Sequence, residues 1–129
     1  DWPTLSESEL SRLLQGAAAV LLQREIPEEV NIAFAQAAKA AGTRVFLDAG
    51  GQDAPISDSL LRLVDVFCPN ESELQRLTGL STSTRADVLA AAQALLARGA
   101  AAVHANKSYV RGTKTSVLLW QIFSRGAKD

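Results

Sequence analysis

The sequence has few residues of the kinds that build disulfides or soft metal sites. Its 129 residues include one cysteine, Cys68, and one histidine, His104. A single cysteine excludes a disulfide within the chain, and these two residues are too few for a cluster of thiolates and imidazoles. A reducing, intracellular compartment is therefore expected. We interpret Cys68 as a small buried hydrophobe, because no histidine base is placed to activate it, and His104 as structural or exposed.

Long apolar runs and an excess of charge are also missing. The longest apolar runs fall far short of the ~20 residues that cross a bilayer, so no membrane partner is expected. The formal net charge of −1 predicts no general attraction to nucleic acid or anionic lipid. The first residues, DWPTLSESEL, lack the features of a signal or transit peptide, and we interpret them as the interior of a domain.

The sequence does contain an alternation of apolar runs and amphipathic segments. Four buried strands are predicted from the runs AAAVLLQ (17–23), TRVFLDA (43–49), VDVFCP (64–69) and AAAV (100–103). Helix starts are predicted at Ser6, Pro27, Ser57, Asn70 and Thr84. The predicted apolar face of the second helix consists of Val30, Phe34, Ala37, Ala38 and Ala41. This order predicts an α/β fold, a three-layer sandwich with a mostly parallel sheet and helices on both faces.

Polar side chains follow each of the first three predicted strands. They are Gln23, Arg24 and Glu25 after the first, Asp48 and Gly50-Gly51 after the second, and Asn70, Glu71 and Glu73 after the third. Ligands of such folds bind beyond the carboxyl ends of the strands. Because carboxylate and amide oxygens suit sugar hydroxyls and hydrated Mg²⁺, the residues alone predict a polar cluster for ligands at this edge.

Each of these residues also has a structural interpretation. Asn70 is a good helix N-cap, and Glu71 and Glu73 suit the first turn of a helix because of its dipole. Glu25 suits a solvated loop. The pair at 50–51 lacks the spacing of a P-loop or a dinucleotide fingerprint.

Two longer stretches resemble a known family. LLQREIP (21–27) and FLDAGGQDAPISDSLLRLVDVFCPNESELQRLTG (46–79) are similar to ribokinases, above all those of plants, within the carbohydrate-kinase family named after the minor phosphofructokinase. The most specific element is PNESE followed by LTG, with LLQREIP at the expected distance upstream. The resemblance covers residues 5–103, about four fifths of the chain, and implies the central part of a ribokinase-like domain.

The resemblance implies an activity and a set of contacts. Ribokinases transfer the γ-phosphate of ATP to the 5-hydroxyl of D-ribose with the help of Mg²⁺, and K⁺ activation belongs to the family. By the family's pattern Glu25 contacts ribose, Asn70 lies by the nucleotide phosphates, and Glu73 holds Mg²⁺ through water. The implied partners are therefore a small sugar and ATP.

Parts of the family pattern do not occur in these residues. The N-terminal aspartate and glycine pair that grip the sugar are missing. So is a D-T-x-G-A-G-D segment, whose last aspartate is the family's catalytic base and whose glycines form an anion hole for the phosphates. The potassium loop is missing with it. We therefore expect no catalytic base in this chain, and we expect the chain alone to be inactive.

Residues 104–129 differ from the rest in charge. They contain five basic residues and one acidic residue, whereas residues 1–103 contain eight basic and 13 acidic ones. We predict that residues 1–103 form the central part of the domain and that residues 104–129 form a divergent tail, which an alternative exon, a retained intron or a frame change would explain. Within the tail, SVLLWQIF (116–123) is expected either to add a strand or to form an aggregation-prone edge.

A short stretch of the tail, RGTKTS (111–116), weakly resembles a nucleotide-contacting turn of the family. It predicts nucleotide contacts for Gly112, Thr113 and Lys114. Thr115 stands where the family has a second glycine, and a residue with a Cβ does not readily adopt positive φ there.

Three alternatives to a ribose kinase stay open from the sequence. One is a kinase of the same family that acts on another sugar or on a nucleoside. Another is a non-catalytic module that self-associates or pairs with a full-length kinase through an open sheet edge. The third is a truncated product with no function of its own. The compartment is open between plastid and cytosol, because any transit peptide would precede Asp1.

Overall fold

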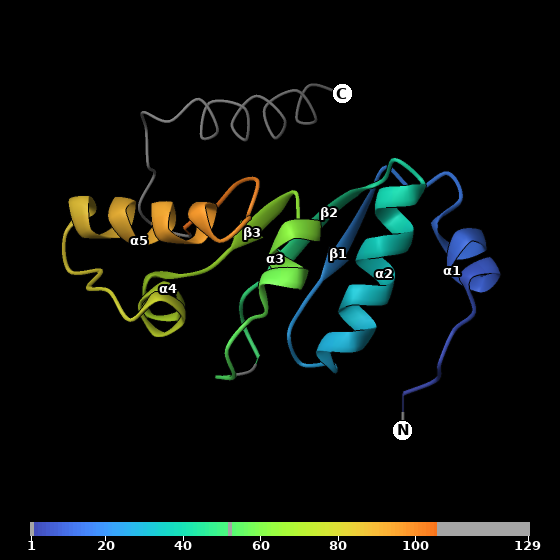
Figure 1. Ribbon diagram of the computed structural model, residues 1–129, viewed down its shortest axis with the longest axis horizontal. Coiled ribbons are helices and arrows are strands. Elements are labelled where there is room, and N and C mark those ends of the chain that lie inside the picture. The colour runs from blue at the N-terminus through green and yellow to red at the C-terminus, as the bar shows by residue number, and fades with distance from the viewer. Residues whose placement is uncertain (1, 52, 106–129) are drawn as a thin grey trace, which may run out of the picture.

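The computed structural model describes residues 2–51 and 53–105. Helices and strands alternate along this part of the chain (Figure 1), in the order α1 (Glu7–Leu14), β1 (Ala19–Leu22), α2 (Glu28–Ala40), β2 (Arg44–Asp48), α3 (Asp58–Leu63), β3 (Val66–Cys68), α4 (Glu71–Thr78) and α5 (Arg85–Ala97). The predicted α/β class is confirmed. The first three strands are shorter at their ends than the apolar runs that predicted them.

β1, β2 and β3 form one parallel sheet in that order. Leu22 of β1 pairs with Leu47 of β2, which in turn pairs with Phe67 of β3. The predicted parallel arrangement is confirmed. Among the described residues, β1 pairs with β2 on one side and with no strand on the other.

The predicted fourth strand at 100–103 is wrong in its extent. Only Val103 pairs with Phe67, in a single parallel bridge. The Phe67 N–H donates to the Ala102 carbonyl oxygen at 2.9 Å, and the His104 N–H donates to the Phe67 carbonyl oxygen at 2.8 Å. Alanine has a low preference for strands, so the alanine run before Val103 does not continue the ladder.

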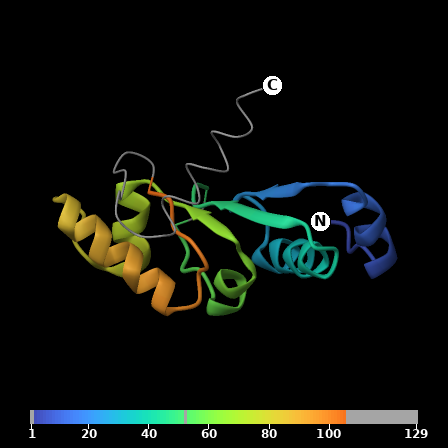
Figure 2. The ribbon, with the colours of Figure 1, turned by 90° about the horizontal axis from the view of Figure 1, so that it is seen from above.

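The main core lies on one face of the sheet. Side chains alternate between the two faces along a strand, so Leu22, Leu47 and Phe67 share a face, and each is at most 8% exposed. α2, α3 and α5 contribute buried residues to the same core, and Figure 2 shows α2 and α3 on one side of the sheet. The opposite face carries Leu21 and Phe46, and Leu21 is 79% exposed.

The apolar face predicted for α2 is confirmed in part: Ala38 is buried, and Phe34 and Ala37 pack against the core. The buried residues of this helix are Asn31, Ala35 and Ala38, whereas Ala41 just beyond it is exposed. Asn31 is 1% exposed, and its Nδ2 donates to the carbonyl oxygen of Gln23 at 2.8 Å. A hydrogen bond of this kind compensates the burial of a polar group, and hydrophobic patterning gives no sign of it.

Three of the helices begin with capping boxes. The N-caps are Ser6 for α1, Asn70 for α4 and Thr84 for α5, as the sequence predicted. In each box the N-cap side chain and the third helical side chain accept each other's backbone N–H. α4 ends at Gly79, whose φ of 71° lies in the left-handed region that glycine adopts without strain.

The tail lies mostly outside the described residues. The strand predicted at 116–123 belongs to that part, and the boundary predicted after residue 103 stays a prediction. Within residues 2–51 and 53–105, no helix is long and apolar enough to cross a membrane.

Two leucines on neighbouring strands test where the core lies. We expect Leu47→Ala to lower the free energy of unfolding by about 2–5 kcal/mol, because its buried side chain would leave a cavity. The matched control, Leu21→Ala, removes an exposed side chain, so we expect a change within about 0.5 kcal/mol. Urea unfolding followed by circular dichroism measures both. Equal losses would contradict a core on one face.

Candidate functional site

The predicted polar cluster forms at the carboxyl edge of the sheet. Glu25, Gly50 and Gly51, and Asn70 follow the ends of β1, β2 and β3. A Cβ placed on Gly51 would lie 2.5 Å from Glu25 Cγ, and one on Gly50 would lie 3.6 Å from Glu73 Oε1. These five residues therefore lie side by side, and with Arg24 we call them the strand-end site.

Arg24 joins the exits of the first two strands. It is 4% exposed, and its Nη2 donates to the carbonyl oxygens of Ala54 at 2.5 Å and Pro55 at 3.1 Å. Its backbone N–H donates to the carbonyl oxygen of Gly50 at 3.2 Å. A buried charge needs partners of this kind. The sequence placed Arg24 among the polar residues after β1, but no sequence signal distinguishes a buried arginine from a solvated one there.

Charges surround this guanidinium. Burial lowers the pKa of Arg24, while the negative charges of Glu28 and Glu73 act in the opposite direction. Arginine nevertheless stays protonated at neutral pH, so Glu73 faces a permanent cation. Arg76 and Asp53 form a salt bridge of 3.0 Å nearby, but both side chains are more than half exposed, and such pairs contribute little stability.

Glu25 is exposed at the end of β1. Its backbone N–H donates to the side-chain oxygen of Gln23. No described residue donates a hydrogen bond to its carboxylate. The carboxylate is therefore available to accept hydrogen bonds from a ligand.

Asn70 and Glu73 hold each other at the start of α4. Asn70 Oδ1 accepts the Glu73 N–H at 2.8 Å, and Glu73 Oε2 accepts the Asn70 N–H at 2.8 Å. Ser72 Oγ also donates to Asn70 Oδ1, at 2.8 Å. The N-cap interpretation of Asn70 is thus confirmed. No described residue accepts a hydrogen bond from its Nδ2, so the donor side of the amide is available to a ligand.

The carboxylates of this site fit magnesium only in a hydrated form. Within the described residues, no group of three histidine, cysteine, aspartate or glutamate side chains could hold a metal ion. Glu73 Oε2 is engaged by the cap, and Asp48 Oδ1 accepts the Gly50 N–H at 2.8 Å. Mg²⁺ commonly keeps several waters and binds one or two carboxylates together with substrate phosphates. The remaining carboxylate oxygens therefore fit a hydrated Mg²⁺ ion that is already coordinated by a phosphate.

Cys68 lies at the end of β3 and pairs in register with Asp48. It is a free, half-buried thiol. Burial raises the pKa of Cys68, and the charge of Asp48 raises it further. Such a thiol is not activated as a nucleophile, in agreement with its interpretation from the sequence.

The other predicted nucleotide contacts, Gly112, Thr113 and Lys114, lie outside the described residues. Their roles stay predictions.

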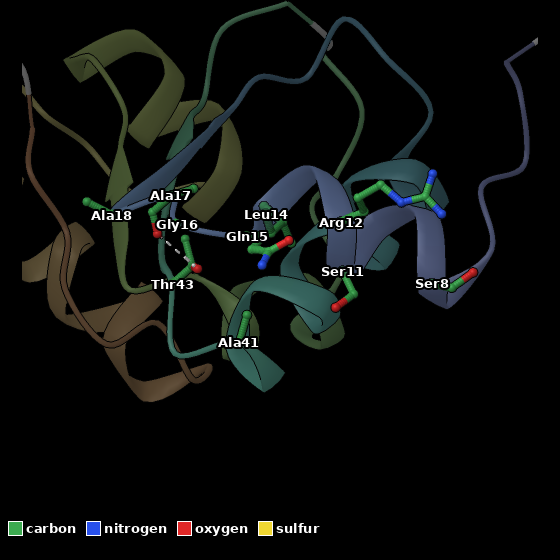
Figure 3. Close-up of a pocket in the computed structure, with 10 residues that line it drawn as sticks. All are labelled: Ser8, Ser11, Arg12, Leu14, Gln15, Gly16, Ala17, Ala18, Ala41 and Thr43. Carbon is green, nitrogen blue, oxygen red and sulfur yellow. Dashed lines mark hydrogen bonds between the residues drawn. The ribbon is translucent and has the colours of Figure 1, made fainter.

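A hollow lies at the amino-terminal ends of β1 and β2, away from the strand-end site (Figure 3). It has a volume of about 730 Å³ and is lined by Ser8, Ser11, Arg12, Leu14, Gln15, Gly16, Ala17, Ala18, Ala41 and Thr43. The Thr43 hydroxyl in its wall donates to the Ala17 carbonyl oxygen at 3.2 Å. Ligands of parallel α/β sheets bind at the carboxyl edge, so size alone does not make this hollow the site.

Comparison with known proteins supports the family resemblance. Residues 1–106 match the model of the pfkB family of carbohydrate kinases. Ribokinase of Arabidopsis thaliana is 48% identical over 83 residues, which are 64% of this chain and 22% of that protein. The bifunctional ribokinase/ribose-5-phosphate isomerase A of Fructilactobacillus sanfranciscensis is 34% identical over 98 residues, 75% of this chain and 18% of that protein. The chain thus spans about a fifth of the length of these relatives.

A solved structure shows the same likeness. The structure of Arabidopsis thaliana ribokinase complexed with ribose and ATP superposes with a TM-score of 0.75 and 44% sequence identity, over 79% of this chain and 33% of that one. The predicted ribokinase-like fold and the predicted resemblance are both confirmed.

The thiol of Cys68 provides a test of the geometry at the ends of β2 and β3. We expect it to react with iodoacetamide at pH 7 more slowly in the folded chain than in urea, because burial and Asp48 disfavour the thiolate. Asp48→Asn should lower the pKa of the thiol and speed the reaction. Rates measured by mass spectrometry across pH 7–10 follow both effects. Faster reaction of the folded chain at pH 7 would contradict this environment.

Proposed function

The chain belongs to the pfkB family of carbohydrate kinases, and from that premise we propose that its strand-end site is part of a site for the ATP-dependent phosphorylation of D-ribose. One observation carries the proposal: Glu25, Asn70 and Glu73 lie at one sheet edge of a chain that superposes on a ribokinase complexed with ribose and ATP. The product of the proposed reaction is ribose 5-phosphate.

Glu25 is the proposed sugar contact. Its carboxylate is exposed and receives no hydrogen bond from a described residue. An ionised carboxylate accepts hydrogen bonds from two neighbouring hydroxyls, which suits a furanose or pyranose edge. Glu25 would hold ribose beside the end of β1 and leave the 5-hydroxyl for phosphorylation.

Asn70 and Glu73 are the proposed contacts to the nucleotide. The cap fixes the Asn70 amide so that Oδ1 faces the helix, and Nδ2 would donate to a phosphate oxygen. Glu73 would hold a water of hydrated Mg²⁺, and the ion, when bound, neutralises charge on the phosphates. We extend the family's K⁺ requirement to the parent enzyme, and we assign none of the described residues to it.

The chemical step needs groups that these 129 residues do not contain. No D-T-x-G-A-G-D segment occurs, so neither the family's base nor its anion hole is present. Loss of a single oxyanion-type donor removes roughly 2.7–4 kcal/mol of transition-state stabilisation. We therefore infer that this chain alone binds substrates and does not turn them over. The proposal concerns ribose first; a different sugar or a nucleoside is the alternative within the family.

One observation favours a second function, as an interaction module. β1 is an outer strand of the described sheet, and Leu21 on its open face is 79% exposed. An exposed strand edge is a template for pairing with another chain. Self-association, or pairing with a full-length kinase, would appear as co-purification without turnover and would be weakened by Leu21→Lys.

Ribose binding is tested on the chain itself. Titration with D-ribose, followed by ¹H–¹⁵N NMR, should shift the amide signals around Glu25. Glu25→Gln should abolish these shifts, because the neutral amide accepts weaker hydrogen bonds. Glu29→Gln, which changes another exposed acid of the same region, is the matched control. A folded chain whose spectrum does not respond to ribose would contradict the proposed substrate, and fructose and adenosine in its place test the alternatives.

The same sample tests the expected lack of turnover. With D-ribose, ATP and Mg²⁺ present, we expect no ADP above the background in a coupled assay. Turnover that is lost on Glu25→Ala would show that the chain carries its own base, contrary to our inference.

Asn70 variants separate the cap from the ligand contact. Asn70→Asp keeps an acceptor for the Glu73 N–H, so stability should stay within about 0.5 kcal/mol, whereas Asn70→Ala should lose about 0.5–2 kcal/mol. Both remove the Nδ2 donor, so both should weaken Mg·ATP binding in calorimetry. Wild-type affinity in Asn70→Asp would mean that Asn70 is only a cap.

A further inference from the structure

Gly51 lies against Glu25 more closely than any other residue type could. Its φ is 114°, in the region that favours glycine. A Cβ at this position would lie 2.5 Å from Glu25 Cγ, 2.8 Å from the Glu25 backbone nitrogen and 3.0 Å from the Arg24 carbonyl carbon. Two of these three atoms belong to the backbone, so no side-chain rotation relieves the overlap.

The other glycines show that this contact is unusual within the described residues. Gly16, Gly42 and Gly79 also have positive φ, between 71° and 77°, but a Cβ on any of them meets no atom within 4 Å. A Cβ on Gly99 would lie 2.6 Å from Arg62 Cγ, which is a side-chain atom. Among the described glycines, only Gly51 is placed so that an added Cβ would lie within 3.0 Å of the backbone of another residue.

The backbone next to Gly51 is held in place, so it does not simply retreat. The Gly50 carbonyl oxygen accepts the Arg24 N–H, and the buried Arg24 guanidinium donates to the carbonyl oxygens of Ala54 and Pro55. These hydrogen bonds lie on both sides of Gly51 in the sequence, and they hold this glycine next to the segment that carries Glu25.

We propose that Gly51 is a positioning residue that fixes the direction of the Glu25 carboxylate toward the sugar. This inference rests on the proposed function, in which Glu25 contacts ribose. Groups that bind or react must keep their place within about 0.5 Å, and a displacement of 1 Å is enough to lose much of their effect. A side chain at position 51 would displace the backbone and the stem of Glu25 together, and so would act on sugar binding through that residue.

The experiment compares Gly51→Ala with Gly42→Ala, which also replaces a glycine of positive φ, here 72°, but has open space around it. The first readout needs no ligand: the NMR amide signal of Glu25 should move in Gly51→Ala and stay in place in Gly42→Ala. The second readout is affinity. Gly51→Ala should weaken ribose binding about tenfold and leave Mg·ATP binding within about twofold, whereas general destabilisation would weaken both.

A double variant tests the same contact through thermal stability, without any ligand. Glu25→Ala removes the Cγ that lies nearest, so Gly51→Ala should lower the thermal midpoint less in that background than in the wild type. Additive midpoint shifts, or an unmoved Glu25 amide in Gly51→Ala, would overturn the proposal. If the wild-type chain does not bind ribose, the proposed function fails, while the amide signal and the double variant still decide whether Gly51 positions Glu25.

Discussion

The strand-end site depends on the burial of one charge. A guanidinium taken out of water is stable only where acceptors and counter-charges surround it, and Arg24 finds its acceptors on Ala54 and Pro55, beyond β2. This requirement places the loop after β2 over the end of β1. It also brings Glu28 and Glu73 into the field of the same cation. The exits of all three strands are therefore arranged around a residue that is not itself exposed to a ligand.

The arrangement of Arg24 also decides what its neighbours do. In the turn after β1, Arg24 is buried, whereas its two neighbours Gln23 and Glu25 are exposed. The loop held by Arg24 then packs on Glu25 through Gly51, where a side chain would overlap the backbone. Glu25, which follows the buried Arg24, is thus exposed and closely packed against Gly51. The proposed sugar contact follows from packing and needs no separate device.

Local signals predicted most of the fold, and long-range contacts account for what they missed. Apolar runs and capping boxes depend on neighbours in the sequence, so the strands, the parallel sheet and the start of α4 at Asn70 were predictable. Asn31 was not, because its burial depends on a carbonyl group eight residues away. The alanine run at 100–103 was misjudged because it is apolar like a buried strand, whereas alanine has a low preference for strands and only Val103 forms a bridge. The roles of Glu25 and Glu73 came from the family resemblance, and their burial and contacts came only from the structure.

The asparagine at the start of α4 provides hydrogen-bond donors that a helix cap does not use. α1 and α5 begin with Ser6 and Thr84, whose hydroxyls satisfy the same N–H group of the first turn. Serine, threonine and asparagine all serve as N-caps, so capping alone does not require an amide at position 70. An asparagine carries in addition an NH₂ group with two donors, and the cap orients that group away from the helix. In the proposed role, an amide held in this way would present donors to an anion at the edge where the strands end, and the adjacent Glu73 would supply the negative charge that a hydrated cation needs. The capping box and the proposed phosphate contact are thus one structure, and its stability sets the geometry of the donors.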